Sequence, residues 1–210
     1  DWSSDVCSSD LEERFLICVA DCTGHGVPGA FMSLISIAFL NEAIRERKIT
    51  SPGSVLNHVR EDIIRALDQE GKNESRDGMD AVLLSFSKDL RNVRFALANN
   101  PLWIIRRAEL IEIKPDKMPV GPHLGVMKDF TQHEMQLESG DQLFLFTDGY
   151  ADQFGGPKGK KFKYAQFSDL LKRIAPLPAE QQKSELEHAL SNWKSGLEQN
   201  DDILVIGIRV

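Results

Sequence analysis

The sequence is poor in cysteine, in basic runs and in long apolar segments, and each shortage excludes a class of protein. Three cysteines among 210 residues, all near the N-terminus, make no disulfide framework and suit a reducing compartment such as the cytoplasm. The 25 basic and 32 acidic residues leave a net charge of −7, with no Lys/Arg run to bind a nucleic-acid backbone or an anionic membrane. The longest apolar-rich stretch, Val27–Leu40, is shorter than the roughly 20 residues of a membrane-spanning helix. We therefore expect no nucleic-acid partner and no membrane segment in this chain.

The cysteines also offer little for a metal site. Cys18 and Cys22 are close enough in sequence to act as paired thiolate ligands. No second Cys/His pair with zinc spacing follows them, so a zinc site is not expected.

The first eleven residues differ from the rest of the chain. Asp1–Leu11 (DWSSDVCSSDL) shows neither a helical nor a strand period and resembles translated adapter sequence found at the ends of metagenomic proteins. We expect residues 1–11 to be a non-native leader and residues 12–210 to form one domain whose natural upstream part is missing.

From residue 12 the hydrophobic pattern predicts a regular order of elements. A first strand is predicted at 14–20, followed by helices at 29–48 and from 51 to about 71. In the middle of the chain, apolar and polar residues alternate as in short strands. Those strands fall at 81–86, 93–98, 102–105, 110–113, 131–137 and 142–146, before helices at 164–174 and 179–197 and a last strand at 203–210. Closely connected strands pair antiparallel, so the order predicts an α+β fold of antiparallel sheets covered by helices.

Three of the predicted strands carry an aspartate at one end. Asp21 ends the first strand, Asp148 follows the strand LFLFT, and Asp201 lies just before the last strand. A carboxylate beside an apolar run loses solvation unless a positive charge compensates it. If these ends meet at one edge of the sheets, a divalent cation is the simplest compensation, and Mg²⁺ or Mn²⁺ prefers oxygen ligands.

A local explanation competes with this interpretation for each aspartate taken singly. Aspartate is common at strand ends and turns because its side chain hydrogen-bonds the nearby main chain. Glycine follows Asp148 directly, and Gly24 and Gly26 follow Asp21 closely. Such turns bring the main chain close to a ligand, which favours the metal-site interpretation.

Five segments around these residues resemble a known family, in its order. They are ADCTGHGVPGAFMS (20–33), DGMDAVLL (77–84), LANNPLWIIR (97–106), FTDGYADQFGG (146–156) and NDDILVIGIRV (200–210). Together they resemble SpoIIE-like bacterial serine/threonine phosphatases, a branch of the PPM (protein phosphatase 2C-like) superfamily, over residues 14–210. The resemblance implies an αββα sandwich, two antiparallel sheets flanked by helices, with two Mn²⁺ or Mg²⁺ ions at one edge.

The resemblance also implies a role for each matching residue. Asp21 would bridge both metals, the main-chain carbonyl of Cys22 would bind one, and Asp148 and Asp201 would hold the other. A metal-activated water would attack phosphorus without a phosphoenzyme. The resemblance also implies two sets of supporting residues. Next to the phosphate these are Gly24, His25 and Gly26. Those that support the metal-binding residues without binding the metal are Asp80, Gly149 and Asp202.

Several residues keep two interpretations at this stage. Asp80 is either a support of the metal ligands or an ordinary solvated β-edge residue, and His25 stands where the family often has lysine. His58 and His188 fall in predicted helices and are expected to pack or to face solvent. The lysines could steer a phosphoprotein or simply solvate a loop; they are Lys158, Lys160, Lys161 and Lys163.

The chain departs from the family in one motif. The family carries Gly-Asp followed by an aromatic residue on a strand before the one that ends at Asp21. Residues 1–11 contain Asp1 and Asp5 but not that pattern. We expect the chain to lack one metal ligand and one sheet strand, and to be weakly active or inactive.

The resemblance implies the catalytic domain of a cytoplasmic signalling phosphatase. Its substrate would be phosphoserine or phosphothreonine on a partner such as an anti-sigma-factor antagonist, and an upstream sensor or regulatory module would control it. Two other functions stay open: a catalytically impaired PPM-fold interaction domain, and a two-metal hydrolase of small phosphoesters.

Overall fold

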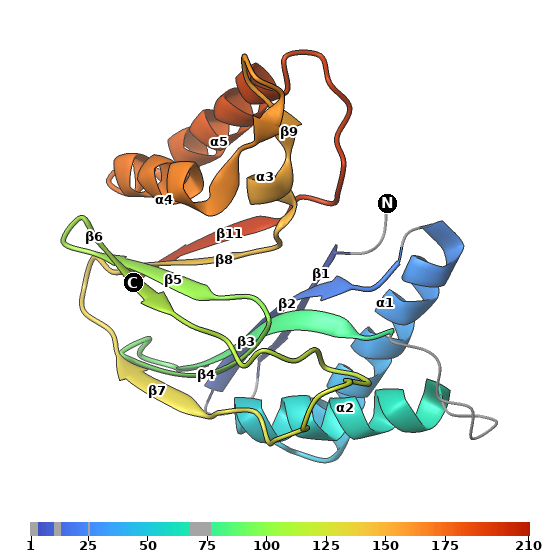
Figure 1. The fold of residues 1–210 in the computed structure, drawn as a ribbon. Helices are drawn as coiled ribbons and strands as arrows, with labels where there is room; N and C mark the ends of the chain where they lie inside the picture. The colour runs from blue at the N-terminus through green and yellow to red at the C-terminus, as the bar shows by residue number, and fades with distance from the viewer. Residues whose placement is uncertain (1–3, 11–13, 25, 68–76) are drawn as a thin grey trace. The chain divides into compact units, whose positions relative to one another are not determined.

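The computed structural model describes residues 4–10, 14–24, 26–67 and 77–210 (Figure 1). The chain divides into two compact units. Unit 1 comprises the chain up to Leu102 together with Ile113–Leu137, and unit 2 comprises Trp103–Glu112 and Glu138–Val210. Each unit is described by itself below.

Unit 1 is built on a five-stranded sheet in the order β1-β2-β3-β4-β7. Every neighbouring pair is antiparallel, and β3 and β4 are joined by a short connection. The strands are β1 (Ser4–Asp10), β2 (Arg14–Cys22), β3 (Met79–Ser87), β4 (Asn92–Ala98) and β7 (His133–Gln136).

Two helices cover one face of this sheet (Figure 1). They are α1 (Gly26–Asn41), which continues into the π-helical turn η1 (Glu42–Glu46), and α2 (Pro52–Leu67). Val55, Val59 and Ile63 recur every fourth residue on α2 and are fully buried, so this face of the helix packs into the core of unit 1. The stretch Gly26–Glu46 is long and apolar enough to cross a membrane, but its residues Met32 and Leu40 are buried in the core of unit 1, as in the core helix of a globular domain.

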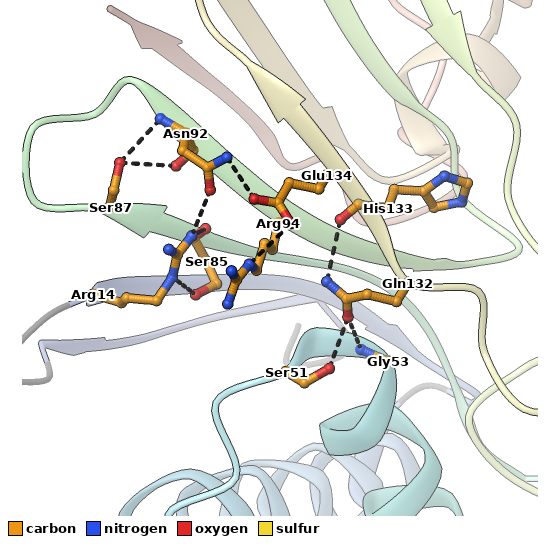
Figure 2. Close-up of polar contacts among 10 residues, drawn as sticks. All are labelled: Arg14, Ser51, Gly53, Ser85, Ser87, Asn92, Arg94, Gln132, His133 and Glu134. Carbon is orange, nitrogen blue, oxygen red and sulfur yellow. Dashed lines mark hydrogen bonds and ion pairs between the residues drawn. The ribbon is translucent and has the colours of Figure 1, made fainter.

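The helix-covered face of the sheet becomes polar at one end. Arg14 Nε donates to Ser85 Oγ at 2.8 Å, and Asn92 Nδ2 and Arg94 Nε donate to the two carboxylate oxygens of Glu134 at 2.8 and 3.2 Å (Figure 2). Arg14, Ser85, Asn92 and Arg94 lie on the same face of the sheet as the core residues further along β2, β3 and β4, because every second residue of a strand points to one face. The network therefore links β2, β3, β4 and β7 where the apolar core ends.

Unit 2 is built on a four-stranded sheet in the order β11-β8-β5-β6, with β8 antiparallel to both β11 and β5. Its strands are β5 (Leu102–Arg106), β6 (Glu109–Ile113), β8 (Gln142–Phe146) and β11 (Val205–Arg209), and a hairpin is formed by β9 (Phe154–Gly155) and β10 (Lys160–Lys161). The helices are α3 (Gly149–Asp152), α4 (Lys163–Ile174) and α5 (Ala179–Lys194).

Aromatic side chains fill the core of unit 2. Phe167 of α4 stacks on Tyr150 of α3, with ring centroids 4.5 Å apart, and meets Phe146 of β8 edge to face at 5.1 Å. Trp103 of β5 packs against Phe146 at 4.7 Å. These contacts hold α3 and α4 on the sheet, which matters because α3 begins directly after Asp148.

One expectation about the N-terminal segment is wrong. Residues predicted to lack a strand form β1, which pairs with β2 from Ser4 opposite Asp21 to Asp10 opposite Phe15. A β-ladder is made of main-chain hydrogen bonds, so an edge strand can form without a side-chain period. That residues 1–11 are a non-native leader stays a prediction.

Candidate functional site

In unit 1 the candidate site begins with two aspartates on neighbouring strands. Asp21 of β2 lies directly opposite Asp80 of β3, and both side chains are half-buried. Asn99 Nδ2 donates to Asp80 Oδ1 at 2.8 Å. Burial raises the pKa of Asp80 above its ordinary value, and the Asn99 hydrogen bond only partly opposes this. Carboxylates directly opposite each other on neighbouring strands repel each other, and a cation would relieve the repulsion.

The turn after Asp21 is held by main-chain contacts. Thr23 N donates to the carbonyl of Gly78 at 2.9 Å, and the Thr23 hydroxyl lies 3.2 Å from the Gly78 amide. Cys22 is buried, with its Sγ 3.7 Å from Ser36 Oγ of α1. The thiol therefore points into the core, which agrees with a role for the Cys22 main chain rather than for its sulfur.

Glycine is required where this turn enters α1. Gly24 has a φ of +95°, and a Cβ at Gly29 would stand 2.6 Å from the Gly24 carbonyl oxygen. Gly26, with a φ of +63°, is the first residue of α1. His25 lies outside the described residues, and the roles of Gly24, His25 and Gly26 next to phosphate stay predictions.

In unit 2 the pairing of β8 with β11 brings two predicted ligands together. Val205 pairs with Phe146, so the antiparallel ladder puts the end of β8 next to the start of β11. Thr147 connects the segment after β8 to the segment before β11: its Oγ1 donates to the Asp202 carbonyl at 3.0 Å and accepts from Leu204 N at 3.1 Å. Asp148 comes directly after Thr147 in the first of these segments, and Asp201 comes directly before Asp202 in the second.

Gly149 allows this close approach. A Cβ at Gly149 would collide with the main-chain oxygen of Asp202. Asp202 is half-buried, and its amide donates to Asp201 Oδ1 at 2.8 Å. Gly149 and Asp202 thus contact the segments that carry Asp201 and Asp148 through the main chain, and their role in supporting metal ligands stays a prediction.

One ammonium group lies within reach of the charges of Asp148 and Asp201. Lys161 Nζ lies 2.6 Å from Asp152 Oδ2. The hydrogen bond to Asp152 is the main cause that raises the pKa of Lys161, and the charges of Asp148 and Asp201 add to it. Both carboxylates therefore act on the same cation within unit 2.

The residues present fit a hard divalent cation. Asp148 and Asp201 in unit 2, and Asp21 with the Cys22 carbonyl in unit 1, offer oxygen donors, which Mg²⁺ and Mn²⁺ prefer. Asp21 belongs to unit 1 and the other two aspartates to unit 2. The meeting of all three around shared ions stays a prediction.

A buried amide that the sequence did not single out organises the segment before Asp201. The Gln153 side chain is fully buried, and its Nε2 donates to the carbonyls of Phe154 and Glu198 at 3.0 Å and to Asn200 Oδ1 at 3.2 Å. Trp193 Nε1 donates to the Gln153 carbonyl at 3.0 Å. The only sequence signal was an amide within the apolar and glycine-rich motif at 146–156.

A second group of metal-ligating side chain types lies in unit 1, between η1 and α2. Ligand atoms of Glu42, His58 and Asp62 lie within 4.8 Å of one another. Arg47 pairs with Glu42 at 2.7 Å, and Arg65 pairs with Asp62 at 2.8 Å. Arginines of the chain thus already compensate both carboxylates, and His58 Nε2 lies 3.2 Å from Asp62 Oδ2.

Comparisons with known proteins show the family and the fold of the chain. The family model of stage II sporulation protein E (SpoIIE) matches residues 12–210, and a sequence comparison with curated proteins gives no match. Among solved structures, the SiaA-PP2C domain of Pseudomonas aeruginosa has a TM-score of 0.89 and 28% identity, with 99% of this chain and 80% of that chain covered. The predicted α+β class, antiparallel sheets flanked by helices, is confirmed as a PPM phosphatase fold.

Two further structures share the fold at lower identity. The RsbU and RsbW domains of Rv1364c from Mycobacterium tuberculosis give a TM-score of 0.72 and 20% identity, over 99% of this chain and 55% of that chain. RsbX in complex with magnesium gives a TM-score of 0.63 and 16% identity, over 99% of this chain and 86% of that chain.

Proposed function

The chain belongs to the SpoIIE family of PPM phosphatases, and from this premise we propose that it hydrolyses phosphoserine or phosphothreonine on a protein partner with Mn²⁺ or Mg²⁺. The observation that supports the proposal is the joining of β8 to β11, which puts the segments that carry Asp148 and Asp201 side by side in unit 2. Asp21, opposite Asp80 in unit 1, supplies the third carboxylate. The magnesium bound by RsbX supports the choice of ion.

The residues of the chain divide the work of the reaction. Asp21, the Cys22 carbonyl, Asp148 and Asp201 would hold two ions, and these supply a water of lowered pKa as the nucleophile. Thr147 and Gly149 keep the Asp148 and Asp201 segments in register, so the carboxylates need little reorganisation when the substrate arrives. Lys161, which pairs with Asp152 and senses the charges of both aspartates, would favour an anionic group on the same side.

The proposed partner is a phosphorylated signalling protein in the cytoplasm. RsbU and RsbW domains occur together in Rv1364c, and this neighbour supports a partner-switching system with an anti-sigma-factor antagonist as substrate. An upstream sensor or regulatory module in the full-length protein would control the activity.

Phosphate release from a phosphoserine protein tests the proposal. We expect release with Mn²⁺ or Mg²⁺, none with EDTA, and a loss of about 100-fold or more in kcat/KM for Asp148→Asn and for Asp201→Asn. Asp169→Asn, which removes an exposed carboxylate that pairs with Lys172 on α4, is the matched control and should keep full activity. Activity that survives EDTA, or that survives both ligand substitutions, would contradict the proposal.

A catalytically impaired PPM-fold interaction domain is the second candidate. The observation that favours it is the lack of a Gly-Asp-aromatic pattern among residues 1–13. This candidate predicts tight binding of a phosphorylated partner without Mn²⁺-dependent hydrolysis of either that partner or p-nitrophenyl phosphate. Faster hydrolysis of nucleotides than of phosphopeptides would instead favour a small-phosphoester hydrolase.

A further inference from the structure

Four lysines surround one small cavity in unit 2. The hairpin β9–β10 and the start of α4 supply Lys158, Lys160, Lys161 and Lys163, and the cavity between them has a volume of about 270 Å³. Trp193, near the end of α5, forms part of its wall. Such a concentration of positive charge is unusual in a chain whose net charge is −7.

Only one of the four lysines has a partner of opposite charge among the described residues. Lys161 pairs with Asp152 and lies 6.0 Å from the centre of the Phe154 ring. Lys158, Lys160 and Lys163 make no ion pair with any residue in the described ranges, and all three are exposed. Ammonium groups gathered in this way repel one another, and an anionic ligand would compensate them.

The cavity wall is fixed by main-chain contacts. Gly156 N donates to the Trp193 carbonyl at 2.7 Å, and a Cβ on Gly155 would collide with that same carbonyl. Phe162, buried at the start of α4, packs edge to face on Trp193 with ring centroids 5.2 Å apart. The lysines are therefore carried by a hairpin that is anchored to α5, and binding an anion need not first order this segment.

The cavity adjoins the elements that carry two candidate metal ligands. Asp152, the partner of Lys161, closes the single turn of α3 that begins after Asp148, and its amide donates to the Asp148 carbonyl at 2.9 Å. Gln153 Nε2 binds both the Phe154 carbonyl of the hairpin and Asn200 Oδ1, next to Asp201. If the acidic side chains of a peptide occupied the lysine cavity, the phosphorylated residue next to them would lie towards Asp148 and Asp201.

We propose that the lysine cavity binds acidic side chains next to the phosphorylated residue of the protein substrate. The substrate class is then a phosphoserine or phosphothreonine with Asp or Glu a few residues away, held by Lys158, Lys160 and Lys163. This inference rests on the proposed function and names the substrate that it selects.

Two phosphopeptides that differ only in their flanks test the inference. One carries Asp and Glu beside phosphoserine, and the other carries Asn and Gln at the same places. We expect the wild-type protein to prefer the acidic peptide by about tenfold in kcat/KM, through a lower KM, and to lose this preference at about 0.5 M salt. The triple variant Lys158→Ala, Lys160→Ala, Lys163→Ala should hydrolyse both peptides with similar kcat/KM.

A charge-matched control separates local binding from net charge. The triple variant Lys88→Ala, Lys114→Ala, Lys117→Ala removes three exposed lysines of unit 1 and should keep the tenfold preference. Equal kcat/KM for both peptides with the wild-type protein, or an equal loss on both in the cavity variant, would overturn the inference while leaving the proposed function intact.

Binding without turnover makes the inference independent of activity. Trp193 fluorescence can report binding of the unphosphorylated acidic peptide in EDTA, with the cavity variant as the comparison. Binding that needs the three lysines, together with no phosphate release in the separate Mn²⁺ assay, would support the cavity as a site for acidic peptides and contradict the proposed function. A response to inorganic phosphate that equals or exceeds the response to acidic peptide would overturn the inference and assign the cavity to free phosphate.

Discussion

Single residues hold the strand ends of the candidate site together. Thr147 joins the segment after β8 to the segment before β11, and Gly149 leaves room for the Asp202 carbonyl. Neither residue carries the negative charge that a metal needs. Their effect is on the positions of Asp148 and Asp201, so substitutions there should change metal affinity through geometry.

Gly149→Ala should weaken metal binding. The added Cβ meets the main-chain oxygen of Asp202, which cannot rotate away as a flexible side chain would, so the Asp201–Asp202 segment must move. We expect Mn²⁺ affinity to fall by about tenfold and the free energy of unfolding without metal to fall by about 1–3 kcal/mol. Calorimetric titration with Mn²⁺ and urea unfolding measure the two quantities.

Gly140→Ala is the control for this substitution. Gly140 has a φ of +92° and open space around its Cβ position, so alanine there adds backbone strain without a collision. Stability should fall while Mn²⁺ affinity stays unchanged. Equal Mn²⁺ affinity in the Gly149→Ala protein would show that this glycine does not position the ligands.

The buried carboxylate of Asp141 should make stability depend on pH. Burial alone would raise the pKa of Asp141, but hydrogen bonds from Arg106, at 2.6 and 2.8 Å, and from the Glu138 amide lower it below its ordinary value. A lowered folded pKa adds stability that is fully present above the unfolded pKa of about 3.9 and disappears as pH falls through the folded pKa.

Asp141→Asn should therefore be less stable than wild type by about 2 kcal/mol at pH 7, with the difference shrinking below pH about 4. Urea unfolding from pH 7 to pH 2.5 measures the two curves. Asp169→Asn, which removes an exposed carboxylate, should follow the wild-type curve. A constant difference between the Asp141→Asn and wild-type curves would contradict this assignment.

At the scale of elements, the start of α2 depends on a residue far away in sequence. Gln132 Oε1 accepts from the Gly53 amide and from Ser51 Oγ, each at 2.9 Å (Figure 2). The first amides of a helix have no partner within it, and Gln132 satisfies one of them from the segment before β7.

Gln132→Ala should loosen the first turn of α2 and lower the free energy of unfolding by about 1 kcal/mol. Gln132→Glu keeps the acceptor and adds negative charge at a helix N-terminus, so it should be at least as stable as wild type. Hydrogen exchange at Gly53 and Val55 is the readout. Unchanged exchange in the alanine variant would show that the contact does not stabilise the helix.

Across the whole molecule, long periodic segments were predictable from sequence and short ones were not. The strands predicted at 81–86 and 93–98 are confirmed within two residues as β3 and β4, and α4 begins one residue before its predicted start at 164. The four-residue helix α3 and the β9–β10 hairpin were missed, because elements of one turn or two residues are too short to show a period. β1 was missed because its pairing depends on the main chain.

The candidate site shows the same division. Aspartates at strand ends predicted that the segments carrying Asp148 and Asp201 lie side by side, and the antiparallel pairing of β8 with β11 puts those segments together. Thr147 and Gln153 act through hydrogen bonds to main chain 45 to 57 residues away, and no local pattern predicts such contacts. The Gly24, His25 and Gly26 roles, and the meeting of Asp21 with the other aspartates, rest on the family resemblance.

Mn²⁺ binding, followed by electron paramagnetic resonance, most directly tests whether Asp21 and Asp148 serve one metal centre. If they do, Asp21→Asn and Asp148→Asn should each lower the affinity by at least about tenfold, and the double variant should bind little worse than either single variant. Independent effects, in which Asp21→Asn leaves the site at Asp148 unchanged or the two losses add in free energy, would contradict a shared centre.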